Sequence, residues 1–141
     1  MPEEMRGKFK HLPHTADVYV EAYGKNLEEA FANAALGMEN IITNTEKVAA
    51  KVKRNIAIAA EDEKALLFDF LTQFLIFHDA ENLVFSEVRV ESIKAANGKL
   101  VLKAVAAGED FNAARHESGT YVKAVSYMEM SIKKEKGKVT I

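Results

Sequence analysis

Apolar and polar residues alternate with two different periods along this chain, and these periods predict its first elements. Asp17 to Tyr23 alternates with a period of two, which predicts a strand that Gly24 ends. From Leu27 to Ile42 the apolar residues recur at spacings of three and four, which predicts a helix. Asn26 is a suitable N-cap for this helix, and Glu29 follows it at the capping-box spacing.

The middle of the chain continues with a short strand pattern and a second helix pattern. Lys8 to Leu12 also reads as a short strand, ahead of the first helix, and Val48 to Ala59 as a longer one after it. Arg54 falls on the apolar side of that strand, which indicates a strand end or a bulge. The second helix, Glu61 to His78, is apolar around most of its circumference. Such a helix is either sandwiched in the core, the more common case, or partly exposed to a partner.

The second half of the chain has a β pattern throughout. Asn97-Gly98 is a strong hairpin turn signal, because both residues tolerate positive φ. The predicted strands are Leu83 to Ile93, Lys99 to Ala107, Thr120 to Lys133 and, after a turn at Lys136-Gly137, Lys138 to Ile141. This order predicts a two-layer α+β fold, with two helices packed on one face of a mostly antiparallel sheet. We expect one domain over residues 1–141.

Composition narrows the class of protein. The 141 residues are 48% hydrophobic, yet no apolar run is long enough to cross a membrane, and the first residues do not resemble a signal peptide. Cysteine is absent, which excludes disulfides, thiolate metal sites and a cysteine nucleophile, and fits the cytoplasm.

Net charge bears on the kind of partner. The formal net charge is −2, whereas proteins that hold nucleic acid tightly usually have a basic surplus. The most basic run, Lys133 to Lys136, is expected to be a solvated strand end or turn. The sequence therefore favours a protein partner over tight, direct nucleic-acid binding.

Two polar segments lie beside predicted strands and carry the candidate chemistry. The first is His14-Thr15-Ala16-Asp17, where Asp17 either binds local backbone amides or presents its carboxylate to a hard cation. The second runs from Gly108 to Tyr127 and is predicted to begin as a loop of about twelve residues, a length often linked to function. Its charged residues Glu109, Asp110, Arg115 and Glu117 are expected to be solvated.

Other candidate groups are isolated. Lys123 lies in an otherwise apolar strand, which is also common for an edge strand. His78 is expected to cap the C-terminal end of the second helix, and His11 to be solvated. No phosphate-binding glycine loop, nucleophile elbow or His-Glu-x-x-His zinc motif is present.

The run His14 to Asp17 and the later Val122-Lys123-Ala124, in this order and at this distance, resemble the archease family. The resemblance covers nearly the whole chain, including Glu29-Ala30-Phe31, Gly108-Glu109 and Arg115-His116. It implies a small α+β accessory protein rather than an enzyme. Such a protein promotes guanylylation and multiple turnover of the GTP-dependent RNA ligase of tRNA splicing.

The resemblance also implies a metal site and a partner surface. The metal ligands would be Asp17, Thr140 and Ile141, for a divalent cation that is foremost calcium, with magnesium or manganese as alternatives. Thr140 departs from the family aspartate, which weakens the site because affinity follows ligand charge. Asn112 likewise replaces an acid, and Glu109, Asp110 or Glu117 could substitute. The partner surface would consist of His14, Arg115, His116 and Lys123.

Two other functions compete with this reading. A chaperone-like modulator of a tRNA-modifying enzyme, such as a tRNA cytosine methyltransferase, would dock through the apolar helix from Leu66 to Phe77 and would not need metal. A stand-alone hydrolase is disfavoured, because no nucleophile and base can be paired from the sequence.

Overall fold

The computed structural model describes residues 9–12, 19–43, 45–111, 133–135 and 138–140. Its elements, in chain order, are β1 (Phe9–Leu12), β2 (Tyr19–Gly24), α1 (Leu27–Ile42), the 3-10 turn η2 (Thr45–Lys47), β3 (Val52–Ala60), α2 (Glu63–Glu81), β4 (Leu83–Ala96), β5 (Lys99–Asp110), β6 (Lys133–Glu135) and β7 (Lys138–Thr140).

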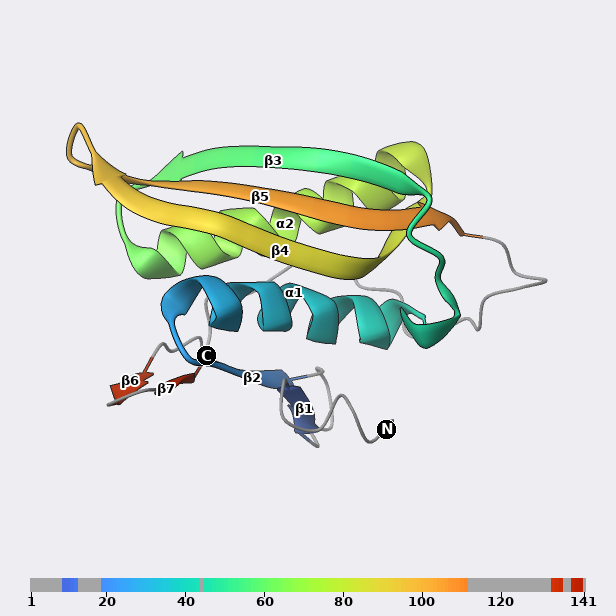
Figure 1. Cartoon of the computed structure of the whole chain (residues 1–141), viewed down its shortest axis with the longest axis horizontal. Coiled ribbons are helices and arrows are strands. Elements are labelled where there is room, and N and C mark those ends of the chain that lie inside the picture. Colours follow the sequence, from blue (N-terminus) through green and yellow to red (C-terminus); the bar gives the residue numbers. More distant parts are fainter. Residues whose placement is uncertain (1–8, 13–18, 44, 112–132, 136–137, 141) are drawn as a thin grey trace.

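The described strands form two antiparallel sheets that share the helix α1. One sheet has the order β1-β2-β7-β6 and the other the order β3-β5-β4. Helix α1 contacts both β2 and β4, and α2 packs across β3, β5 and β4 (Figure 1). The predicted α+β class, with two helices packed against antiparallel strands, is confirmed.

Helix α1 begins where the sequence predicts. The side chain of Asn26 accepts a hydrogen bond of 2.8 Å from the Glu29 amide, and the Glu29 carboxylate accepts one of 3.3 Å from the Lys25 amide. The first bond satisfies an amide that a helix start leaves unpaired, and the second ties the residue before the cap to the first turn. The helix ends at Thr43, whose backbone is extended and whose amide donates to the Glu39 carbonyl.

Helix α2 is shifted by two to three residues from its prediction. Asp62 caps it, and it continues to Glu81 rather than stopping at His78. Asn82 ends it in the left-handed conformation, with φ 56°, which asparagine adopts more readily than other non-glycine residues. His78 lies in the last turn, as expected, with its Nδ1 3.1 Å from the Leu83 carbonyl oxygen.

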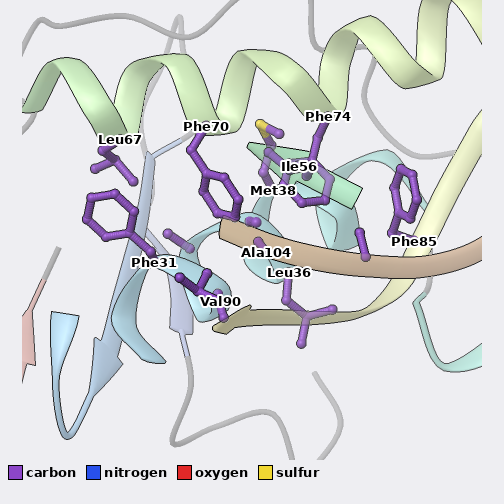
Figure 2. Packing of buried hydrophobic residues seen from close by; sticks show 14 of the residues in the cluster. Phe31, Leu36, Met38, Ile56, Leu67, Phe70, Phe74, Phe85, Val90 and Ala104 are labelled. Atoms are coloured by element: carbon purple, nitrogen blue, oxygen red, sulfur yellow. The ribbon is translucent and has the colours of Figure 1, made fainter. Parts of the chain in front are cut away.

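Apolar side chains of α2 pack into the hydrophobic core. Phe70 stacks on Phe31 of α1, with ring centroids 6.1 Å apart. Phe74 meets both Phe70 and Phe85 of β4 edge-on, with ring centroids 5.1 Å and 5.4 Å apart. Figure 2 shows Leu67, Phe70 and Phe74 projecting from the helix toward this cluster. Ile76, 51% exposed, is the one exposed large hydrophobic residue among those described. The core alternative for this helix is therefore confirmed.

The three-stranded sheet differs from its prediction at the strand ends. Asn97 and Gly98 form the hairpin turn, with φ 52° and 79°, as predicted. Strand β5 continues three residues past Ala107, and β3 starts at Val52 rather than Val48, because residues 48–51 have irregular backbone. Arg54 stays in register opposite Ala106, and its Nη2 lies 2.7 Å from Glu81 Oε1 of α2. Of the two predicted alternatives the bulge is wrong, whereas Arg54 does lie near a strand end, two residues after the start of β3. The register shifts fall in β4 instead.

Candidate functional site

Thr140, a predicted metal position, lies in β7 next to the strand that follows Asp17. The Cα partner of Thr140 is Tyr23, and that of Val139 is Gly24. Because the pair is antiparallel, β7 runs toward Tyr19, the first residue of β2. Asp17 precedes Tyr19 by two residues in the sequence. The register therefore directs the end of β7 toward the start of β2.

Helix α1 fixes the position of β2 at this point. The Asn33 side-chain amide donates a hydrogen bond of 2.6 Å to the Tyr23 carbonyl. Gly24 packs so closely on the first turn of α1 that a Cβ there would overlap the backbone of Ala30. A glycine is required here for close approach rather than for an unusual φ. The strand partner of Thr140 is thus held by a buried helix.

Most of the predicted site lies outside the described residues. This holds for Asp17 and Ile141, the other predicted ligands, and for the partner surface of His14, Arg115, His116 and Lys123. Asn112 and Glu117 also lie there. Neither the ligand set nor the partner surface is tested by the structure, and both stay predictions.

Glu109, predicted to be a solvated loop residue, is instead a buried strand residue. It belongs to β5 and is 5% exposed. Its Oε2 accepts a hydrogen bond of 2.6 Å from the Ala49 amide, and its Oε1 lies 3.7 Å from Lys51 Nζ. The Lys51 amide also donates to the Gly108 carbonyl, at 2.9 Å. Glu109 therefore fastens the segment before β3 onto the end of β5.

The neighbouring residues explain why the strand continues here. Gly108 lies so close to β4 that a Cβ would overlap the Val84 carbonyl oxygen. Phe85 and Glu87 of β4 pair with the consecutive residues Gly108 and Ala107, which leaves Ser86 as a β-bulge. Asp110 is exposed, as predicted, whereas the predicted loop start at Gly108 is wrong.

Sequence reasoning missed one buried acid, Glu39 of α1. It is fully buried, and neither carboxyl oxygen forms a hydrogen bond of normal geometry among the described residues. Burial raises the pKa of Glu39 well above its usual range, and the nearby Phe85 backbone opposes the shift only in part. The carboxyl therefore lies against β4 next to the Ser86 bulge and resists ionisation.

A sequence signal for Glu39 did exist. It follows Ala35 by four residues and Leu36 by three, so it occupies the apolar stripe of the predicted helix. An acid in an apolar stripe is a candidate for a shifted pKa. The apolar stripe does not predict how deeply Glu39 is buried, because that depends on the packing of β4 against α1.

The donor chemistry of the predicted metal site suits a hard cation only weakly. Among the described residues, no group of three or more histidine, aspartate or glutamate side chains gathers to hold a metal. Glu109, a suggested substitute ligand, is already engaged with Ala49 and Lys51. The predicted set has the Asp17 carboxylate, the neutral Thr140 hydroxyl and a main-chain oxygen of Ile141, all oxygen donors of the kind that calcium and magnesium accept. This set fits a divalent cation, with lower charge than an aspartate at position 140 would give.

Neither described helix combines the length and apolarity needed to span a bilayer.

Comparison with known proteins gives the family of this chain. The sequence profile of the Archease protein family matches residues 9–141. Protein archease of Thermococcus kodakarensis is 45% identical over 127 residues, which covers 90% of this chain and 89% of that protein. Protein archease of Methanosarcina mazei is 37% identical over 137 residues, which covers 97% of this chain and 93% of that protein.

Solved structures agree with the fold. The solution structure of Methanobacterium thermoautotrophicum protein 1598 superposes with a TM-score of 0.80 at 35% identity, covering 95% of this chain and 94% of that one. The crystal structure of a Thermotoga maritima archease, described as a possible chaperone, has a TM-score of 0.53 at 20% identity, covers 93% and 91%, and supports the fold alone. The profile match along nearly the whole chain and the identity to curated archeases place this protein in the archease family.

Proposed function

We propose that this chain activates the GTP-dependent RNA ligase of tRNA splicing, as the archease resemblance implies. The chain would act as an accessory protein that promotes transfer of GMP to the ligase and repeated ligation by the same ligase molecule. The observation that carries the proposal is family membership over residues 9–141. The pairing of Thr140 with Tyr23 agrees with it in one respect, because it puts one predicted metal position beside the strand that follows Asp17, six residues along the sequence from Asp17.

In this proposal the metal would be held by Asp17, Thr140 and Ile141. A divalent cation at these residues would supply a positive charge able to accept a further oxygen ligand from a partner. The chain itself would position that charge, since Asn33 and Gly24 hold β2 against α1 and β2 holds β7. His14, Arg115, His116 and Lys123 would contact the ligase.

The alternative, a modulator of a tRNA cytosine methyltransferase, relied on an exposed apolar helix. Leu66, Leu67, Phe70, Phe74 and Leu75 are all buried in the described part of the molecule. Ile76 is exposed and Phe68, Leu71 and Phe77 are half-buried, so only part of the apolar surface of α2 is accessible for docking of that kind. The buried helix therefore weighs against this alternative.

The test is the rate of GMP transfer to a purified RNA ligase with labelled GTP, with and without this protein. We expect the wild-type chain to accelerate labelling of the ligase. Asp17→Ala should lose the acceleration, because it removes a charged metal ligand. Asp69→Ala is the matched control, since it removes an exposed carboxylate of α2 instead, and it should behave as wild type.

Circular dichroism of each variant separates a lost site from a lost fold. A ligase that is labelled equally fast with and without the wild-type chain would contradict the proposal. Equal acceleration by Asp17→Ala and wild type would support the ligase as the partner but would show that Asp17 is not needed for activation.

A further inference from the structure

Among the described elements, helix α2 covers one face of the sheet β3-β5-β4, and neither helix covers the other face. Leu102, Ala104 and Ala106 of β5 are buried, on the side against which α2 packs. Figure 1 shows α2 passing behind the three strands, with neither helix over the side turned to the viewer. Because side chains alternate along a strand, the residues between these three point to the other face.

Register identifies the residues of this second face, which we call the outer face. Directly paired residues share a face, so four rows cross the sheet: Lys53-Ala107-Glu87, Asn55-Val105-Arg89, Ala57-Lys103-Ser92 and Ala59-Val101-Lys94. Lys99 continues the series two residues from Val101. Its side chain and those of Lys53, Arg89, Lys94 and Lys103 are exposed.

The outer face is basic although the chain is acidic. Five cations lie on it, and none of them forms an ion pair in the described part of the chain. The acids nearby are Glu87 and the bulge residue Glu91, so five positive and two negative charges leave a surplus of three. Since the whole chain has a net charge of −2, everything else carries a surplus of five negative charges. The overall charge therefore conceals a basic face.

The composition of the outer face indicates the kind of anion that it suits. Four of its five cations are lysines, a residue type depleted at protein interfaces, and no aromatic residue or methionine lies in the four rows. Binding of single-stranded nucleic acid depends on aromatic side chains that stack on bases. A duplex instead offers regularly spaced phosphates that lysine and arginine bind without stacking.

We propose that the outer face binds the phosphodiester backbone of a nucleic-acid duplex. Lys53 lies opposite Ala107, eight residues along β5 from Lys99, so the cations span about 26 Å at about 3.3 Å per residue. A duplex carries one charge per about 1.7 Å of its axis, so many phosphates fall within this span. Binding is independent of base sequence and weak, with a dissociation constant on the order of 10⁻⁶ to 10⁻⁴ M at physiological salt. The inference does not depend on the proposed function, because it concerns this chain alone.

The test is fluorescence anisotropy of the full chain with labelled RNA and DNA duplexes of about 16 base pairs, at salt concentrations from about 50 to about 200 mM. The face variant combines Arg89→Gln with Lys103→Gln. The control variant combines Lys25→Gln with Lys64→Gln, which removes the same charge from exposed lysines outside the sheet. Thermal unfolding confirms that both variants are folded.

We expect the face variant to bind at least about tenfold more weakly at low salt and to reduce the slope of log K against log salt by about two. The control should remain within about twofold of wild type, because contributions from charges outside the contact are screened by salt. Equal binding of both duplexes, or tighter binding of RNA, supports the proposal and identifies the duplex form preferred.

Three results would overturn it. One is no binding of wild type to either duplex at low salt. Another is an equal loss in the face and control variants, which would mean attraction by net charge only. The third is binding of poly-glutamate, lost in the face variant, without binding of either duplex, which would assign the outer face to an acidic protein.

Discussion

The carboxyl group of Glu39 has no counter-charge and no hydrogen-bond partner of normal geometry among the described residues. Its pKa is raised by burial, so the folded protein keeps the proton at pH values where the unfolded chain has released it. Below the ordinary glutamate pKa both states are protonated, and Glu39 carries no ionisation penalty. Above it, the unfolded state binds fewer protons, so stability falls with rising pH until the folded pKa is reached.

Glu39→Gln should remove this pH dependence, because glutamine does not ionise. Between the ordinary glutamate pKa of about 4.3 and the raised folded pKa, the free energy of unfolding of the variant should gain on wild type by up to about 1.4 kcal/mol per pH unit. Urea unfolding at pH 4 and pH 7 measures the difference. Glu87→Gln, which changes an exposed carboxylate of β4, is the matched control. A Glu39→Gln profile parallel to wild type would show that Glu39 ionises normally.

The proposed metal site predicts that the charge at position 140 sets its affinity. Thr140→Asp should bind calcium more tightly than wild type, because it adds a charged oxygen ligand to Asp17 and Ile141. Thr140→Asn is the matched control, since it is similar in size to aspartate but uncharged, and it should not tighten binding. Isothermal calorimetry measures the affinities, and Asp17→Ala should abolish binding in either background. Equal affinities for Thr140→Asp and Thr140→Asn would exclude position 140 from the site.

At the scale of the elements, β5 continues three residues past its predicted end, and Glu109 lies in this extension. Glu109→Ala should leave the Ala49 amide without its acceptor and weaken the segment that leads into β3. We expect a loss of about 1–3 kcal/mol in the free energy of unfolding. Faster hydrogen exchange at the Ala49 amide is the specific readout. Asp110→Ala, at the exposed neighbour, should leave that exchange unchanged, and protection retained in Glu109→Ala would contradict the role.

Elements with strong local signals could be predicted from the sequence. Asn26 capped its helix and Asn97-Gly98 formed its turn, because capping and positive φ depend on neighbouring residues alone. The ends of β3 and β5 could not be predicted, because they depend on long-range contacts. Glu109 resembles a solvated acid until Ala49 and Lys51, some sixty residues earlier, are brought beside it.

At the scale of the whole molecule, the sequence indicated the family but not the distribution of charge. The run from His14 to Asp17 and the segment around Lys123 carried the resemblance, which the match over residues 9–141 bears out. The outer face requires the register of three strands, because Arg89 and Lys103 become neighbours only through β4–β5 pairing. Net charge, an average over the chain, contains no such information.

The central claim is that this archease activates an RNA ligase, and multiple turnover tests it most directly. The measurement is the number of ligations per ligase molecule, with RNA ends in large excess and GTP present, with and without equimolar wild-type chain. We predict that the ligase alone stops near one round and that the chain carries it through many. A ligase that joins the same number of ends in both cases would contradict the account.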